Sequence, residues 1–478
     1  MMKLLTIIAA LALTHTLKAE SLLIKLATPA SAEFAVQSMI AKGLKATVVS
    51  NDWIEVSGNV KASQFAKFIN SGSALVVQPN YKVHTYENPA FQKLRQNGQL
   101  MKYLQTVAPR LASGADNPAL PTGAPAIKLG ADPLATNQWG MQDIGLQEAL
   151  TVNYGVRNVT IAVIDTGVDY LHEDLRQSLW YNSKEVPNNG IDDDKNGYID
   201  DMIGWDFLDN DNKPYDLTGN ILQILQGGNP GHGTHCAGNI GATGNNSLGI
   251  SGVYPRARIM SLRFIGDKGG TTAAAVQAIR YAVDNGAKVL SNSWGSEGED
   301  PSDTTNNAAL KEAIQYAQDK GVLFIAAAGN GHQGVGYDND SDAKPGFPAS
   351  YANDNIISVA AIDSSDALGK FSNWGIKTVD IGAPGVKVYS TTSDGKYADT
   401  LGISIPGLIE LPLAGWDGTS MATPHVAGAA ALYWSAHPKK TWKEVKAAIL
   451  ASAKPISSLQ GKVVSGGKLS VSELMKIK

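Results

Sequence analysis

The chain has 478 residues, of which 43% are hydrophobic and 18% charged, an ordinary balance for a globular protein of two or three folding units. A formal net charge of −4 provides no basic surface, so we expect no nucleic-acid partner. The chain holds one cysteine, Cys236, which excludes an internal disulfide.

Residues 1–19 have the pattern of an export signal. Lys3 supplies a positive charge, an apolar stretch follows from Leu4 to Leu13, and Ala19 ends a weak cleavage site. The apolar stretch is too short to span a bilayer, and no other segment approaches about eighteen uninterrupted apolar residues. We therefore expect a secreted protein, extracellular or periplasmic, without a membrane span. A buried N-terminal helix is the alternative.

Residues 20–87 have the pattern of a small α+β domain. The expected elements are a strand, a helix, a hairpin turning at Asn51-Asp52, a short helix and a final strand, at Ser21–Ala27, Ala32–Leu44, Ala46–Val56, Phe65–Ile69 and Leu75–Val83. This β-α-β-β-α-β order fits a ferredoxin-like plait. An unrelated small domain is the alternative.

Residues 88–125 are predicted to be a linker. A helical piece, Phe91–Leu104, precedes a stretch dominated by Pro, Gly, Ala and Ser. Such stretches are easily nicked by proteases, so maturation cuts are expected in or near this region.

Residues 126–478 are predicted to form the largest domain, and from residue 158 its pattern alternates strands with helices. The expected strands are Val159–Ile164, Arg258–Arg263, Val289–Asn292, Val322–Ala327 and Ile356–Ala360, and the expected helices are Thr272–Asn285, Asn306–Lys320 and Met421–His437. This pattern predicts an α/β fold, a mainly parallel sheet with helices on both faces. Active sites in such sheets lie at the carboxyl ends of strands, and Asp165 directly follows the first strand.

Three motifs carry the chemistry. Asp165 lies in Val-Ile-Asp-Thr-Gly, His232 in Gly-His-Gly-Thr-His-Cys-Ala-Gly, and Ser420 in Gly-Thr-Ser-Met-Ala-Thr-Pro-His. Asp, His and Ser in this chain order form the subtilisin arrangement of a catalytic triad. With these motifs, residues 130–478 resemble the subtilisin-like serine endopeptidases, and residues 20–87 resemble their propeptide, which assists folding and inhibits the enzyme.

The triad would divide the work among three side chains. Ser420 needs a base to take its proton, His232 is that base, and Asp165 holds the imidazole in one tautomer and stabilises the imidazolium. Ser420 is expected to open a helix, where backbone N–H groups favour a developing oxyanion, with Pro424 in the first turn. The resemblance implies that Asn330 donates a second hydrogen bond to the oxyanion.

The resemblance also implies a substrate cleft. Its two edges would bind a peptide as an added β-strand, and small residues would line a roomy S1 pocket. The edge and pocket residues are Lys268, Gly269, Gly270, Ser293, Trp294 and Gly295, then Ala327, Ala328, Gly329 and Gly346. We expect broad specificity with large hydrophobic or aromatic P1 residues. Asp338, Asp340 and Asp342 leave basic P1 residues as an alternative.

Cys236 lies four residues after His232, on the same helix face. In the thiol-containing members of the family, this cysteine lies beneath the histidine and is not the nucleophile. The simplest interpretation is a small buried hydrophobic residue. A zinc site formed by Cys236 with His232 and His235 is the alternative, although no Cys-x-x-Cys pair or His-Glu-x-x-His motif supports it.

An acidic loop predicts Ca²⁺ binding. Asp192, Asp194, Asn196, Gly197, Tyr198 and Asp200 occupy positions 1, 3, 5, 6, 7 and 9 of an EF-hand-like loop. Position 12 is Ile203, so the usual glutamate is missing and Asp201 is expected to replace it. A solvated acidic loop without an ion is the alternative.

The resemblance implies a second calcium site. Asp174 and Asn246 match the family's strong site, which the carbonyls of Gly244, Leu248 and Ile250 would complete, and Asp132 matches a ligand of thermitase-like members. Bound Ca²⁺ would stabilise an exported protein that lacks disulfides.

Residues 398–413 form a long apolar connection before Ser420, which is expected to flank the cleft or to bind a partner. Taken together, the sequence predicts a secreted, monomeric, calcium-stabilised serine endopeptidase that is made as a zymogen, cuts its own propeptide and acts on protein substrates. The rival interpretations are a binding module that has lost catalysis and a processing protease with one target.

Overall fold

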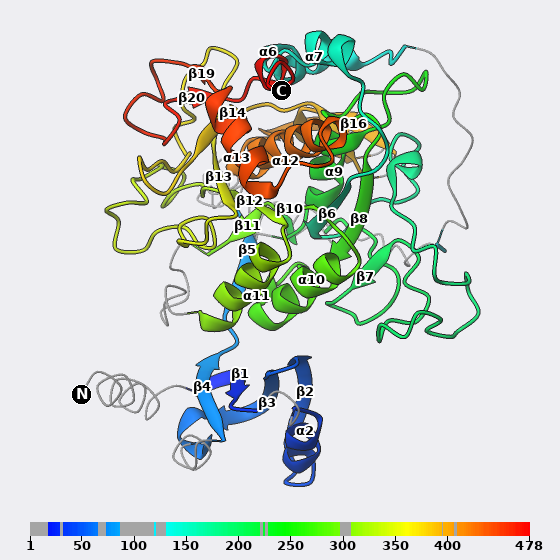
Figure 1. Cartoon of the computed structure of the whole chain (residues 1–478), viewed down its shortest axis with the longest axis vertical. Coiled ribbons are helices and arrows are strands. Elements are labelled where there is room, and N and C mark those ends of the chain that lie inside the picture. Colours follow the sequence, from blue (N-terminus) through cyan, green and yellow to red (C-terminus); the bar gives the residue numbers. More distant parts are fainter. Residues whose placement is uncertain are drawn as a thin grey trace.

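The computed structural model describes residues 18–28, 32–65, 73–86, 119–120, 131–219, 223–224, 228–296, 307–393, 395–405 and 409–478. Most of the predicted export signal and most of the linker, including its helical piece Phe91–Leu104, lie outside the described residues. Figure 1 shows a small N-terminal body, coloured blue, and a large body that contains the rest of the described chain. No helix among the described residues has the length and apolar character needed to cross a bilayer.

The small body is an antiparallel sheet with a helix. Its elements are β1 (Lys18–Leu26), α2 (Ala32–Ile40), β2 (Lys45–Ser50), β3 (Trp53–Lys61), the 3-10 turn η2 (Ala62–Phe65) and β4 (Ala74–Pro79). The strand order β2-β3-β1-β4 is that of the expected ferredoxin-like plait. Its core contains Leu22, Ile24, Ile54 and Val56 from the strands, packed with Val36 and Met39 of α2.

The strand expected at Leu75–Val83 is two strands in the structure. After β4, Asn80 and Tyr81 interrupt the pairing, and β5 (Lys82–Thr85) follows. β5 leaves the small sheet and lies between β11 (Trp294–Gly295) and β9 (Gly270–Thr271) of the large body. Figure 1 shows β5 next to β11. Alternation in the sequence predicted an extended chain, but it did not predict that the partner would change.

The large body is built on a nine-stranded sheet in the order β19-β20-β14-β13-β12-β10-β6-β8-β7. Neighbouring strands from β20 to β7 run parallel, and only β19 pairs antiparallel. The bounds are β6 (Thr160–Asp165), β7 (Gly204–Asp206), β8 (Arg258–Arg263), β10 (Val289–Asn292), β12 (Leu323–Ala327), β13 (Ile356–Ile362), β14 (Ile381–Pro384), β19 (Lys454–Pro455) and β20 (Gly467–Lys468). The mainly parallel α/β fold expected from the sequence is confirmed.

Helices cover both faces of the sheet. The helices are α6 (Trp139–Asp143), α7 (Leu146–Val152), α9 (His232–Gly241), α10 (Thr272–Asp284), α11 (Ala308–Asp319), α12 (Thr419–Ala436), α13 (Trp442–Ala451) and α14 (Val471–Leu474), with 3-10 turns at Ala135–Asn137 and Arg176–Ser178. Alternate residues of β6 face the two layers: Ile161 and Val163 pack in a core with α9 and α12, whereas Ala162 and Ile164 pack in a core with α10 and α11. Burial on both faces explains why the four central residues of β6, Ile161 to Ile164, are all apolar.

Two hairpins complete the large body. β15 (Ser390–Thr392) pairs with β16 (Lys396–Ala398), and β17 (Thr400–Ile405) pairs with β18 (Ile409–Gly415). The second hairpin accounts for most of the long connection at 398–413 and leads directly into α12. The connection therefore has regular structure of its own.

Candidate active site

Asp165 and His232 form the centre of the site. Asp165 ends β6 and His232 begins α9, and both side chains are buried. Oδ1 of Asp165 lies 2.8 Å from Nδ1 of His232 and accepts a 2.7 Å hydrogen bond from the backbone N–H of Thr166. The carboxylate thus holds the ring through Nδ1, which leaves Nε2 as the nitrogen for proton transfer.

Burial lowers the pKa of His232, but the Asp165 carboxylate outweighs burial and raises that pKa well above its ordinary value of 6.5. Within the described residues, Nε2 of His232 is buried and has no hydrogen-bond partner. A buried polar atom without a partner is rare in folded proteins, and here it is the atom that a general base would use.

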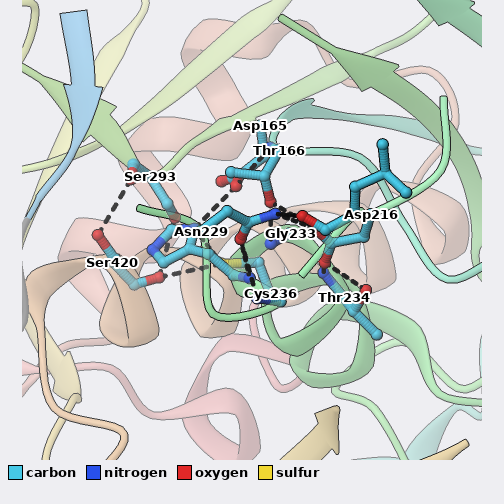
Figure 2. Close-up of polar contacts among 12 residues, drawn as sticks. Asp165, Thr166, Asp216, Asn229, Gly233, Thr234, Cys236, Ser293 and Ser420 are labelled. Carbon is cyan, nitrogen blue, oxygen red and sulfur yellow. Dashed lines mark hydrogen bonds and ion pairs between the residues drawn. The ribbon is translucent and has the colours of Figure 1, made fainter. Parts of the chain in front are cut away.

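Ser420 is the second residue of α12 and forms a reciprocal pair with Ser293, which directly follows β10 (Figure 2). Its Oγ donates to the carbonyl oxygen of Ser293 at 3.0 Å, and Oγ of Ser293 donates to the carbonyl oxygen of Ser420 at 2.9 Å. Sγ of Cys236 donates to the same Ser420 carbonyl at 3.5 Å and lies 3.9 Å from Nδ1 of His232. Cys236 therefore contacts both Ser420 and His232.

Pro424 is not in the first turn of its helix, contrary to the expectation from the sequence. α12 begins at Thr419, so Pro424 is the sixth helical residue and cannot donate the usual N–H to the carbonyl of Ser420. Ser293 and Cys236 supply the donors instead. The sequence motif contains the proline, but the helix starts one residue before Ser420 and so places Pro424 in its interior.

Asn330 faces the start of α12. Its Oδ1 accepts hydrogen bonds from the backbone N–H and from Oγ1 of Thr419, both at 2.9 Å. These bonds orient the side-chain amide, and its Nδ2 lies beside Gly418, 3.2 Å from where a Cβ would stand. The amide nitrogen is therefore held next to the residues that lead into Ser420.

The two predicted cleft edges lie on either side of β5. Trp294 and Gly295 pair antiparallel with Thr85 and His84, and Gly270 pairs with Val83. Gly269 also lies here, because a Cβ on it would meet the imidazole of His84 at 2.4 Å. A segment of the chain itself thus lies between the two edges as an added strand.

Tyr86, at the end of this segment, lies among the residues predicted for the S1 pocket. It is buried, with its hydroxyl 3.5 Å from the carbonyl oxygen of Phe347. A Cβ on Gly295 would lie 2.1 Å from this hydroxyl, and one on Gly346 would lie 3.3 Å from it. The two glycines therefore leave the space that the phenol fills.

The other predicted pocket residues lie at the end of β12. Ala327 and Ala328 are buried, and the backbone N–H of Gly329 donates to Oγ1 of Thr419 at 3.2 Å.

The three carboxylates proposed to bind basic P1 residues accept hydrogen bonds from backbone N–H groups of nearby loops. Asp338 accepts from Asp340, Asp340 from Lys377 and Thr378, and Asp342 from Lys344.

The acidic loop surrounds a carboxylate that the sequence analysis missed. Glu185, Asp192 and Asp194 offer ligand oxygens that all lie within 4.8 Å of one another. Glu185 accepts from the backbone N–H groups of Asp193, Asp194 and Asp200. A loop motif that begins at Asp192 does not include a glutamate seven residues upstream, so the sequence pattern gave no signal for it.

The remaining predicted ligands of this loop have other partners. Asp201 is buried and accepts from Tyr281 of α10, Asn182 and Asn196. Asp200 accepts from the backbone of Asn189 and Gly190, and Oδ1 of Asn196 accepts from the N–H of Tyr198. Asp201 therefore attaches the loop to α10.

The residues predicted for the second calcium site lie close together. Oδ1 of Asp174 accepts from Nδ2 of Asn246 at 2.7 Å, and Oδ2 accepts from the N–H of Ile250 at 2.8 Å. Asp132 accepts from the N–H groups of Asn245 and Asn246. Backbone from Asn245 to Ile250 thus bonds to the two carboxylates, and the N–H of Leu248 donates to Oδ1 of Asn246. Within the described part of the chain, Gly244 bonds to neither carboxylate.

A model of the subtilase family matches residues 156–469 of the chain. Thermitase from Thermoactinomyces vulgaris is 36% identical over 68% of this chain and 90% of its own length. A thermophilic serine proteinase from Bacillus sp. (strain AK1) is 36% identical over 67% of this chain and 62% of its own length. Subtilisin-like protease 1 from Plasmodium berghei is 29% identical over 71% of this chain and 53% of its own length. The chain belongs to the subtilase family of serine endopeptidases.

Proposed function

We propose that Ser420, His232 and Asp165 are the catalytic triad with which this endopeptidase cleaves peptide bonds of proteins. The observation that carries the proposal is the 2.8 Å bond from Asp165 to Nδ1 of His232, which leaves the buried Nε2 without a partner among the described residues. Ser420 must rotate its Oγ from the Ser293 carbonyl to donate its proton to Nε2.

The proposed reaction has two steps, acylation of Ser420 and hydrolysis of the acyl-enzyme. Oγ of Ser420 attacks the carbonyl carbon while Nε2 of His232 takes the hydroxyl proton, and the resulting oxyanion accepts from the Ser420 N–H and Nδ2 of Asn330. The C–N bond then breaks, and the amine leaves with the proton from His232. In the second step, water attacks the acyl carbon while Nε2 of His232 takes one of its protons. The C–O bond to Ser420 then breaks, Oγ regains a proton from His232, and the acid product leaves.

We further propose that the enzyme is a zymogen. Residues 1–19 form the export signal, residues 20–87 the inhibitory propeptide, residues 88–125 the linker and residues 126–478 the catalytic domain. Support comes from β5, which is paired on both sides in the cleft, and from contacts of the small body with α10 and α11. Oε1 of Gln78 accepts from the N–H of Ala308, and Oδ1 of Asn80 accepts from the N–H of Ala273.

The first bond cut is proposed to be the one between Tyr86 and Glu87. Support comes from the phenol of Tyr86, which fills the space left by Gly295 and Gly346. The same pocket favours aromatic and large apolar P1 residues in protein substrates. The mature enzyme is proposed to be a secreted monomer without a nucleic-acid partner.

Ca²⁺ is the proposed cofactor. The donor set fits this ion, because Glu185, Asp192 and Asp194 bring three hard carboxylates within 4.8 Å of one another. The turn around Asp174 and Asn246, with Asp132 beside it, is the second candidate. Bound Ca²⁺ would screen the repulsion among these carboxylates and hold two loops, and no step of the hydrolysis is assigned to it.

The test is a time course of intact masses for the purified precursor and for its Ser420→Ala variant. Wild type is expected to shed a fragment that ends at Tyr86, while Ser420→Ala stays whole. Equal cutting of both proteins would overturn self-processing.

Two substitutions of Tyr86 locate the first cut. Tyr86→Asp places a charge in the space that the phenol fills and is expected to slow cleavage of this bond. Tyr86→Phe keeps the ring and loses the 3.5 Å contact of the hydroxyl with Phe347, so it is expected to be cut like wild type. Cleavage at an unchanged rate in Tyr86→Asp would overturn the assignment of this bond.

A further inference from the structure

The loop before α9 holds a buried carboxylate that the triad itself does not use. Asp216 has no exposed surface, and it lies beside both the end of β6 and the start of α9 (Figure 2). Nothing in the sequence around it, Tyr-Asp-Leu, indicates a function. A buried carboxylate is costly unless its oxygens are well bonded, so its partners matter.

Both oxygens of Asp216 are fully used. Oδ1 accepts from Oγ1 of Thr166 at 2.9 Å and from Nδ2 of Asn229 at 2.6 Å. Oδ2 accepts from the N–H of Thr234 at 2.9 Å and from its hydroxyl. Burial raises the pKa of Asp216 to about 6, so the carboxylate is ionised in alkaline solution.

Two of these partners, Thr166 and Asn229, also bond to Asp165 and His232 or to the residues next to them. The Thr166 hydroxyl donates to Asp216 and accepts from the N–H of Gly233, next to His232, while the N–H of Thr166 donates to Asp165. Oδ1 of Asn229 accepts from the N–H groups of Gly231 and His232, at 2.9 and 3.0 Å. The network thus joins the residue after Asp165 to the residues on both sides of His232.

We propose that Asp216 is a positioning residue. It fixes the end of β6 and the start of α9 relative to each other and so keeps the Asp165 carboxylate aligned with the His232 ring. The inference rests on the proposed triad. Asparagine at this position would fit the space but has one acceptor oxygen and an NH₂ group that faces donors. A carboxylate is therefore required, because each of its oxygens meets a group that can only donate: Nδ2 of Asn229 on Oδ1 and the N–H of Thr234 on Oδ2.

The test measures kcat and KM on a peptide p-nitroanilide ending in tyrosine, with active sites counted by a sulfonyl fluoride. Asp216→Asn is expected to lower kcat per active site at least about tenfold and to leave KM within about twofold, since small displacements of catalytic groups are costly. The matched control is Asp380→Asn, which removes a buried carboxylate that bonds Ser358 far along the sheet, and it is expected to keep kcat.

Thr166 provides a second pair of variants if Asp216→Asn does not fold. Thr166→Val removes the hydroxyl that links Asp216 to Gly233 and is expected to lower kcat, while Thr166→Ser keeps the hydroxyl and is expected to restore it. Unchanged kcat in Asp216→Asn, an equal loss in Asp380→Asn, or no recovery in Thr166→Ser would overturn the positioning role. Hydrolysis by Ser420→Ala would instead overturn the proposed triad.

Discussion

Ser293 and Ser420 exchange hydrogen bonds: each hydroxyl donates to the other residue's carbonyl oxygen, at 2.9 and 3.0 Å. The bond to the Ser420 carbonyl replaces the helical bond that Pro424 cannot make, because proline has no N–H. Ser293 therefore helps to fix the backbone of the proposed nucleophile from the neighbouring strand end.

This relationship predicts a compensating pair of substitutions. Ser293→Ala is expected to lower kcat about two- to tenfold, the equivalent of one net hydrogen bond of about 0.5–1.5 kcal/mol. Pro424→Ala returns an N–H four residues after Ser420, so the double variant is expected to recover part of the loss. Kinetics per titrated active site would show this, and a double variant slower than both single variants would refute it.

The proposed catalytic residues were easier to predict from the sequence than the residues proposed to position them. Asp165, His232 and Ser420 lie in long local motifs, and β6 and α12 were predicted within two residues because apolar periodicity is local. Asp216 and Glu185 were missed because their partners are backbone groups and polar side chains that only the folded chain brings near. The change of partner from β4 to β5 was missed for the same reason.

Asn330 is expected to contribute mainly to turnover. Its Oδ1 is held by Thr419, which fixes the orientation in which Nδ2 would meet a developing oxyanion. Asn330→Leu is expected to lower kcat about 10²–10³-fold with little change in KM, the loss measured for the equivalent donor of subtilisin. Thr419→Val, which removes one of the two donors to Oδ1, is expected to cost less. A change confined to KM would contradict the assignment.

The enzyme is expected to be most active at alkaline pH. Burial lowers the pKa of His232, but the Asp165 carboxylate raises it well above 6.5, and only the neutral ring can accept the serine proton. The acid limb of kcat/KM should therefore have its midpoint above 6.5, with the slope of one proton. Asp165→Asn removes the charge and should move this midpoint down while lowering the rate. An acid limb centred below 6.5 in wild type would contradict the prediction.

The same pair also links stability to pH. A histidine whose pKa is raised on folding stabilises the protein fully below its unfolded value of about 6.5, and this contribution is lost as pH rises through the folded pKa. The inactive Ser420→Ala precursor, which cannot digest itself, is the protein in which to measure it. Its urea midpoint should fall with rising pH above 6.5 by more than that of Ser420→Ala/His232→Ala. Parallel pH profiles of the two proteins would contradict the linkage.

Calcium removal is expected to lower the melting temperature. Glu185, Asp192 and Asp194 lie within 4.8 Å of one another and repel unless a cation lies among them, and an ion at about 100 times its Kd stabilises the folded state by about 2.7 kcal/mol. For a domain of this size that corresponds to several degrees. Ser420→Ala precursor, melted in excess Ca²⁺ and in EDTA, avoids the complication of autolysis.

A substitution tests whether the stabilisation by Ca²⁺ comes from the acidic loop. Glu185→Gln removes one of the three clustered carboxylates and should shrink the difference between the melting temperatures in Ca²⁺ and EDTA, whereas the exposed Glu148→Gln should leave it unchanged. Asp174→Asn tests the second candidate site in the same way, because its two oxygens hold Asn246 and Ile250. Equal melting temperatures in Ca²⁺ and EDTA would show that neither loop needs the ion for stability.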